Sequence, residues 1–345
     1  MILASPYVFL ILLSGLGSFF RVPYMGLLAS IFYATLASLM IPIIQLSDNV
    51  AYEHYFYSSL RLSYENSKFG IGYYFLNKFM VNFVEYEIFR ALFIVFTLSV
   101  KIYLLFRTTK FILLALAFYF AFQFYVDSYL VRASFATSFA LIALFYRFKG
   151  QPIIGGLFLT VAITFHLSTI AVVPLWILAN LKISRRLHLV IFLSLFVFSQ
   201  FPLAELTAEL LMLILPNSSG VVKLFSYVGS THGEAAGILR GSILMYSFIH
   251  ICFLLLVDRN EAMFSDLNSF VLNCMLFAIF FLLVFNDMVV ISDRISRFTL
   301  FFYVIGVTIV VGSLSQGKRA LAYCFLGCFG ILSGLILDEG PYDII

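Results

Sequence analysis

The chain has 345 residues, of which 63% are hydrophobic and only 11% are charged, and its formal net charge is +4. A soluble domain carries about 25% charged residues, so this composition excludes a water-soluble fold. It predicts an all-α, polytopic transmembrane protein that forms a single integral membrane domain. The charged residues form no block of like charge along the sequence, so they give no indication of nucleic-acid binding.

Long apolar runs follow one another along the chain. Because roughly 20 apolar residues cross a bilayer core, the runs provide about 12 membrane segments. The candidate segments are 2–20, 24–45, 87–106, 111–126, 128–146, 153–165, 167–181, 187–202, 241–257, 267–285, 298–314 and 320–337. No basic region precedes the first run, so we interpret it as a retained membrane segment rather than a cleaved signal peptide.

Basic residues lie in the short turns that follow every second run. The first basic residues of these turns are Arg21, Arg107, Arg147, Lys182, Arg259 and Lys318. Short basic loops are cytoplasmic in multi-pass membrane proteins, so the pattern predicts that both termini face outward. The acidic residues between Asp338 and Asp343 agree with this orientation.

The segments 153–165 and 167–181 are each shorter than a full crossing, and His166 lies between them. We interpret them as a broken hairpin, because this assignment keeps Lys182 and Arg185 on the cytoplasmic side. A single tilted helix over the whole stretch is the alternative, and it would reverse the orientation of every later loop.

Three stretches are expected to form outer loops, namely 46–86, 203–240 and 286–297. The first is rich in tyrosine, and its second part, 70–79, is apolar but interrupted by polar residues. This pattern favours a helix that lies at the membrane interface or dips back into it, rather than a crossing.

Ionisable residues are nearly absent from the middles of the predicted segments. Lys101 lies near a cytoplasmic end, where its long side chain is expected to reach the headgroups. His250 and the four cysteines lie among apolar residues and are interpreted as packing residues. Since ion-coupled transporters carry carboxylates or histidines near the midplane, this distribution places the chemistry at the outer face.

Four arginines stand at the outer ends of predicted segments. They are Arg132 (segment 128–146), Arg240 (241–257), and Arg294 with Arg297 (298–314). Helix N-termini present unpaired amides and a positive dipole, and arginine forks suit phosphate oxygens. These residues form a strong anion site if the three helices converge. The alternative is that each arginine pairs with a nearby carboxylate. The candidate pairs are Arg132 with Asp127, and Arg294 or Arg297 with Asp287 or Asp293.

Candidate residues for proton transfer and sugar binding lie in the same outer segments. His166 at the hairpin break can accept a proton from a hydroxyl; the alternative is that it only caps the break. Glu65, Asp48 and Asp127 are the other candidate bases. The candidate sugar contacts are Tyr52, Tyr55 and Asp127, because tyrosine and carboxylate side chains hold sugars by stacking and hydrogen bonding. No carboxylate cluster indicates a metal site.

Several short motifs follow one another in a fixed order. They are Asp48 with Tyr52 and Tyr55, Glu65 before the stretch from Gly70 to Asn77, Arg132-Ala133-Ser134-Phe135-Ala136, His166 with Ser168, and Arg294-Ile295-Ser296-Arg297-Phe298. In this order they resemble the EpsG/Wzy type of bacterial polysaccharide polymerase, across most of the chain.

The resemblance implies a GT-C-like membrane glycosyltransferase that joins oligosaccharide repeat units carried on undecaprenyl diphosphate. It places the reaction at the outer face of the bacterial inner membrane, with O-antigen or an exopolysaccharide as product. The arginines would bind the departing diphosphate, and no nucleotide or other cofactor is needed because the donor bond is already activated. A metal is not expected. The expected partners are the lipid-linked oligosaccharides, membrane lipid and a chain-length regulator.

Two other functions are compatible with a polytopic chain. A lipid-linked oligosaccharide flippase would need a charged, solvated path through the midplane, which the sequence does not indicate. A membrane O-acyltransferase would use His166 as its base, but on a path that opens to the cytoplasm.

Overall fold

The computed structural model describes residues 47–67, 69–215, 222, 241–258, 263–315 and 318–319. Within these ranges the regular secondary structure is entirely helical. This confirms the all-α prediction for the described part of the chain. The predicted segments 2–20, 24–45 and 320–337, and Arg240, lie outside the described residues.

Several of the helices are long and apolar enough to cross a membrane. Among the described residues, four meet this standard, or five if one bent helix pair counts as a span. They are α5 (Tyr86–Thr108), α8 (Val131–Phe148), α15 (Asp266–Val284) and the part Ile291–Ser313 of α16 (Val289–Ser313). The chain is therefore a multi-pass membrane protein, although these ranges contain fewer full-length spans than the sequence predicts.

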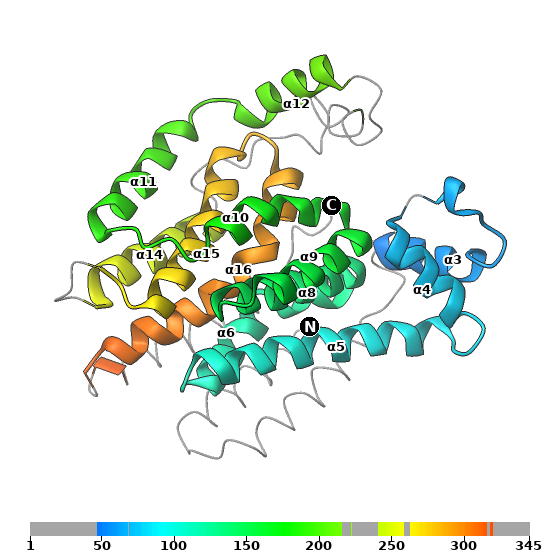
Figure 1. Ribbon diagram of the computed structural model, residues 1–345, viewed down its shortest axis with the longest axis horizontal. Helices are drawn as coiled ribbons and strands as arrows, with labels where there is room; N and C mark the ends of the chain where they lie inside the picture. The colour runs from blue at the N-terminus through cyan, green and yellow to red at the C-terminus, as the bar shows by residue number, and fades with distance from the viewer. Residues whose placement is uncertain are drawn as a thin grey trace. The chain divides into compact units, whose positions relative to one another are not determined.

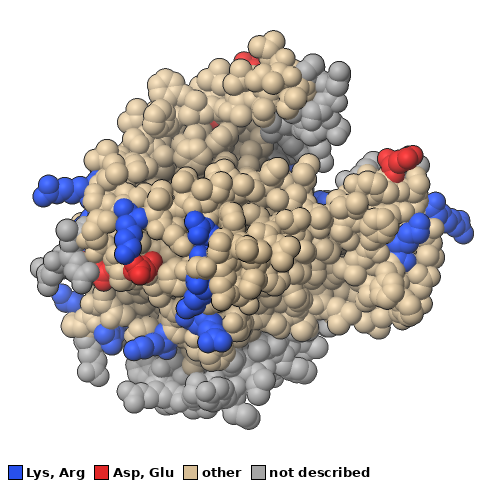
Figure 2. Space-filling model, in the orientation of Figure 1, with Lys and Arg blue, Asp and Glu red and all other residues tan. Residues whose placement is uncertain are grey.

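The chain forms two compact units. Among the described residues, unit 1 takes those up to Trp176 together with those from Leu314 on, and unit 2 takes Ile177–Ser313. α10 (Val172–Leu178) continues from one unit into the other. On the face drawn in Figure 2, most of the surface of the described residues carries no charge, as a lipid-facing surface requires.

Unit 1 is built around three helices that pack along one another, since α8 contacts both α5 and α9. Of these, α9 comprises Pro152–Phe165. The further elements of unit 1 are α3 (Ser47–Ser58), η2 (Tyr64–Asn66), α4 (Ile71–Met80), α6 (Ile112–Phe122), α7 (Phe124–Tyr129) and η3 (Leu167–Ala171). α3 and α4 are grouped at the end of α5 where that helix begins (Figure 1).

The predicted interruption at His166 is confirmed. α9 ends at Phe165, and His166 has extended backbone angles (φ −146°, ψ 105°) before the chain turns into η3. A second break was not predicted. The run 111–126 divides at Gln123 (φ −128°, ψ −32°), which separates α6 from the six-residue α7.

α4 agrees with the interpretation of 70–79 as an interfacial helix. It has 10 residues, about half of the roughly 20 needed to cross a bilayer. Tyr73 and Tyr74 are buried on one face, whereas Phe75 and Phe79 are 57% and 61% exposed on the other. A helix with one apolar face turned outward suits the boundary between lipid and water.

Unit 2 contains α11 (Arg185–Phe198), α12 (Leu203–Ile214), α14 (Gly241–Leu256), α15 and α16. α15 and α16 pack along each other. α11 and α12 are bent by 79° at the break between them. The Asp287 carboxylate accepts hydrogen bonds from the backbone N–H groups of Ala204 (2.9 Å) and Glu205 (3.0 Å), so it caps the free N-terminus of α12.

The predicted outer loop 286–297 is mostly wrong. α16 begins at Val289, nine residues before the predicted segment, and only a short turn separates it from α15. No glycine or proline interrupts the sequence from Val289 to Arg297, so nothing prevents the helix from continuing outward. In the turn between α15 and α16, Asn286 and Asp287 form hydrogen bonds with other parts of unit 2.

Candidate functional site

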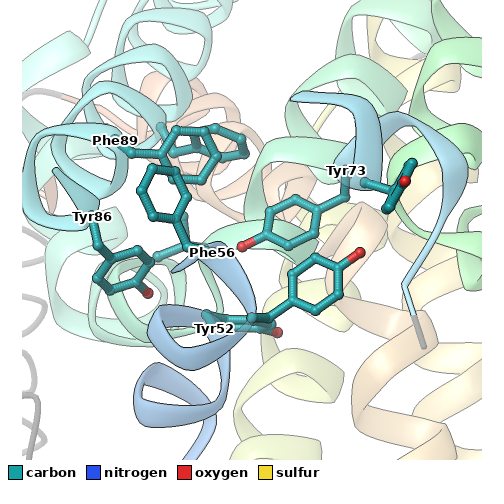
Figure 3. Close-up of a cluster of buried hydrophobic side chains, with 9 residues drawn as sticks. Tyr52, Phe56, Tyr73, Tyr86 and Phe89 are labelled. Atoms are coloured by element: carbon teal, nitrogen blue, oxygen red, sulfur yellow. The ribbon is translucent and has the colours of Figure 1, made fainter. Parts of the chain in front are cut away.

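An aromatic cluster lies where α3, α4 and the starts of α5 and α8 meet. Its buried residues are Tyr52, Tyr55, Phe56, Tyr73, Tyr74, Tyr86, Phe89, Phe93 and Val131. Figure 3 shows the rings of Phe56 and Phe89 packed together beside Tyr86 and Tyr73. The cluster anchors the chain between α3 and α4, within the predicted outer loop 46–86, on the starts of α5 and α8, and it thereby positions the polar residues at its edge.

The predicted sugar contacts Tyr52 and Tyr55 belong to this cluster. They are only 6% and 7% exposed. Tyr55 stacks on Tyr73 (centroids 6.0 Å apart, 16° between the planes) and meets Phe69 edge-on at 4.4 Å. The burial of both side chains therefore leaves little ring surface on which a sugar could stack. The Tyr55 hydroxyl lies 2.6 Å from Ser67 Oγ, so it is engaged within the loop.

Burial keeps the hydroxyl groups of this cluster protonated. It raises the pKa of Tyr55, although the hydrogen bond with Ser67 and the positive charge of Arg132 act in the opposite direction. Burial also raises the pKa of Tyr73 well above the ordinary value for tyrosine. Both groups are thus neutral hydrogen-bond donors near pH 7, and neither is suited to act as a base.

Arg132 lies against the edge of the aromatic cluster. It is the second residue of α8, as the sequence predicts for a helix start. Its guanidinium carbon is 4.6 Å from the centre of the Phe69 ring and 5.9 Å from that of Tyr73, a cation–π arrangement that holds the group in place. Its Nε is buried, and within the described residues it has no hydrogen-bond partner. A fixed cation with an unused donor, at a helix N-terminus, is suited to bind an anion.

The first turn of α4 presses against the last turn of α9. A side chain at Gly70 would overlap the carbonyl oxygen of Thr164, and a Cβ at Gly72 would lie 2.6 Å from Thr164 Oγ1. Only a residue without a side chain permits this approach. Phe69, whose ring lies under the Arg132 guanidinium, is thereby placed next to the end of α9, which leads into His166. The structure thus brings Arg132 and the hairpin break into one region of unit 1.

The predicted carboxylate bases lie in α3 and η2. Glu65 is exposed, in the middle of η2. Asp48 lies in the first turn of α3, and its side chain is outside the described part of the structure. Neither placement selects one of these residues over His166 as the base.

Asp127 has a different environment from the one predicted. Its carboxylate accepts hydrogen bonds from Tyr119 Oη (2.6 Å) and Ser134 Oγ (2.8 Å), and it forms an ion pair with Lys101. It therefore does not pair with Arg132. The prediction that Lys101 reaches the cytoplasmic headgroups is wrong, since its side chain is 3% exposed and reaches Asp127 instead.

Arg90 was missed in the sequence, although it is among the largest fully buried side chains of the described residues (1% exposed). Its Nη2 donates to the carbonyl oxygen of Ser128 at 3.4 Å. An arginine at the fourth position of an apolar run, here 87–106, must find polar partners inside the protein. This position is the signal in the sequence that points to Arg90. His250 agrees with its interpretation as a packing residue: it is 0% exposed and stacks on Phe192 at 4.7 Å.

Arg294 and Arg297 lie in unit 2, inside α16 rather than at its first residue. Arg294 is exposed and Arg297 is partly buried. Asp287, one of their candidate partners, caps α12 instead. The meeting of these two arginines with Arg132 and Arg240 in one anion site stays a prediction. Among the described residues, no group of three or more His, Cys, Asp or Glu side chains is arranged to hold a metal ion.

Comparison with known proteins gives one finding. The model of the EpsG family matches residues 24–337. No curated protein and no solved structure match the chain.

Proposed function

The chain belongs to the EpsG family of polysaccharide polymerases, and from this premise we propose that it joins lipid-linked oligosaccharide repeat units into a long surface polysaccharide. The proposed carrier is undecaprenyl diphosphate, and the proposed location is the outer face of the bacterial inner membrane. The product would be O-antigen or an exopolysaccharide. The membrane helices, the outer aromatic cluster and the cation held at its edge support this assignment.

The proposed reaction transfers the growing chain from one carrier lipid to the next repeat unit. A hydroxyl oxygen of the incoming unit bonds to the anomeric carbon of the growing chain, and the bond from that carbon to the phosphate oxygen breaks. The diphosphate leaves with the electron pair of the broken bond. The hydroxyl proton passes to a base, for which we propose His166, with Glu65 and Asp48 as alternatives.

The observation that carries this proposal is the environment of Arg132. Negative charge builds on the diphosphate as its bond to sugar breaks, and a cation already held in place stabilises that charge without reorganising. Arg132 meets this requirement because Phe69 and Tyr73 fix its guanidinium while Nε keeps an unused donor among the described residues. We propose that Arg240, Arg294 and Arg297 contact the same diphosphate.

The outer loop would contact the sugars. Because Tyr52 and Tyr55 are nearly buried, we propose that they would do so through their hydroxyl groups rather than by stacking, and the Tyr55 oxygen can make a further hydrogen bond beside the one it shares with Ser67. Asp127 is not included, because hydrogen-bond donors from unit 1 already occupy both of its oxygens. No nucleotide or other cofactor enters the proposed reaction, since the diphosphate ester is an activated donor.

Arg132→Gln tests the proposal, and Arg107→Gln is the matched control. Arg107 also lies over a tyrosine ring, that of Tyr103 at 5.3 Å, but in the last turn of α5. Surface polysaccharide from cells that carry each variant is separated on a gel, and the membrane protein is measured on a blot. We expect Arg132→Gln to accumulate normally but to yield only single repeat units, and Arg107→Gln to yield the full ladder. A full ladder from Arg132→Gln contradicts the proposal.

One observation favours the alternative function as a flippase. Unit 1 contains a buried pair of charged side chains, Lys101 and Asp127, within its helices. Lys101 and Asp127 neutralise each other, however, and their side chains are only 3% and 14% exposed, so they do not line a solvated path. Vesicles that contain the purified protein and a labelled lipid-linked oligosaccharide would separate the two functions. Movement of the label across the bilayer without polymer formation would favour the flippase.

A further inference from the structure

The polar contacts of Asp127 connect three helices to the chain that enters α8. Asp127 lies in α7, whose end at Tyr129 is followed by Leu130, the cap residue of α8. Lys101 of α5 and Tyr119 of α6 reach one carboxylate oxygen, and Ser134 of α8 donates to the other at 2.8 Å. The Asp127 carboxylate thus connects the turn between α7 and α8 to α5 and α6 through one oxygen and to α8 through the other.

The link to Ser134 acts on the first turn of α8. Leu130 has non-helical backbone angles (φ −87°, ψ 51°), so the chain changes direction there. Besides the backbone bond from Ser134 N–H to the Leu130 carbonyl oxygen (2.9 Å), this turn is held to the preceding segment by the side-chain bond to Asp127. A charged acceptor makes that bond stronger than a neutral one, and the negative charge also suits the N-terminus of α8.

The ion pair between Lys101 and Asp127 holds the Asp127 carboxylate in place. Both partners are shielded from water, and a buried charge that loses its partner is strongly destabilised. Asp127 therefore cannot turn away to another ligand without breaking its ion pair with the buried Lys101. This also explains why Asp127 is unsuited to follow a sugar hydroxyl during a reaction.

We propose that Asp127 is a positioning residue: through Ser134 it fixes the first turn of α8, and so it holds Arg132 in the orientation that binds diphosphate. The inference rests on the proposed function, because it assigns Arg132 the diphosphate as ligand. Arg132 and Ser134 share this turn, and the aromatic faces of Phe69 and Tyr73 hold only the far end of the arginine side chain. The hydrogen bond between Asp127 and Ser134 would in turn hold the backbone of Arg132, because both Arg132 and Ser134 lie in the first turn of α8.

The test uses Ser134→Ala, because Asp127→Asn would leave a buried charge and affect folding directly. Ser134→Ala removes the link to α8 and leaves the Lys101–Asp127 pair intact. Ser138→Ala is the control: Ser138 lies one turn further along α8, is also buried, and donates to the Ser134 carbonyl oxygen rather than to Asp127. Each variant is combined with a nitroxide label on Ala133→Cys, in a chain without its native cysteines.

We expect Ser134→Ala to increase the mobility of the label and to raise the KM for lipid-linked donor by about tenfold, on the scale of one hydrogen bond to a charged group. The kcat should change much less, and Ser138→Ala should change neither quantity. An immobile label together with an unchanged KM in Ser134→Ala overturns the inference.

The label reports on α8 whether or not the protein polymerises sugars, so the two proposals fail separately. If Arg132→Gln makes normal polysaccharide while Ser134→Ala still mobilises the label, the proposed function is wrong and the hold of Asp127 on α8 stands. If Arg132→Gln makes no polymer while Ser134→Ala leaves the label immobile, the proposed function stands and the positioning role is refuted.

Discussion

The helices α8 and α16 both carry arginines near their starts, but different contacts hold their first turns. In α8, Asp127 bonds to the Ser134 side chain, and Arg132 lies against aromatic rings. In α16, the preceding aspartate, Asp287, bonds to the backbone of another helix, α12. An aspartate close before an arginine-bearing helix therefore predicts neither an ion pair with that arginine nor a cap for that helix. Which groups it meets depends on the packing of each unit.

The largest expected effect would come from removing the arginines themselves. Loss of one preorganised contact to a developing negative charge costs about 100-fold or more in rate. We expect Arg132→Gln to reach this level, and Arg297→Gln to match it if the α16 arginines share the diphosphate. Polymer formation from purified lipid-linked repeat units would give both rates. A normal rate for Arg297→Gln, beside a defective Arg132→Gln, would confine the anion site to unit 1.

The next prediction concerns the free energy of unfolding, which we expect to depend on the buried pair of Lys101 and Asp127. Asp127→Asn removes the carboxylate charge that pairs with the buried Lys101, at a cost of about 3–5 kcal/mol. The double variant Lys101→Met with Asp127→Leu removes both charges and should recover most of this stability. Thermal unfolding of the purified protein in detergent gives the comparison. If Asp127→Asn unfolds at the wild-type temperature, the pair does not exist as described.

The contact between α4 and α9 is expected to tolerate no side chain at Gly70. In Gly70→Ala the new methyl group must displace the backbone at Thr164, and such overpacking costs about 1–3 kcal/mol. Gly241→Ala is the control, since nothing lies within 4 Å of its Cβ position. We expect Gly70→Ala to lower both the unfolding temperature and the yield of polymer. Equal stability of the two variants would show that the contact is looser than described.

The smallest effect is expected at the cap of α12. Asp287→Ala removes the acceptor for two backbone N–H groups, and loss of an N-cap costs about 1 kcal/mol. The change should appear as faster hydrogen exchange in the first turn of α12, with the polymerisation rate reduced by less than in Arg132→Gln. A loss of stability as large as that of Asp127→Asn would mean that Asp287 does more than cap this helix.

The sequence predicted the features that depend on local pattern. Apolar runs of sufficient length located α5, α8 and α15 to within a few residues, and the break at His166 followed from two short runs with a polar residue between them. The predicted start of α16 is too late, because the charged residues Asp293 and Arg294 favour a loop although no helix-breaking residue is present. Charge alone does not end a helix.

The contacts that define the candidate site could not be predicted in the same way. Lys101 and Asp127 are 26 residues apart, and their pairing depends on the break at Gln123, which the apolar run conceals. The burial of Tyr52 and Tyr55 follows from the packing of α3 and α4 against α5. The position of Arg132 was predictable, but not the rings that hold it, since Phe69 reaches it only because α4 docks at Thr164.

The turn between α15 and α16 has a mechanical consequence for unit 2. The Asn286 side chain donates to the Ser199 carbonyl oxygen at the end of α11 (2.9 Å), and Asp287 binds the start of α12. Both sides of the bend between those helices are thus fastened to one short turn. A tilt of α16 is therefore expected to move the start of α12 with it, because both helices next to the bend are bonded to the turn that precedes α16.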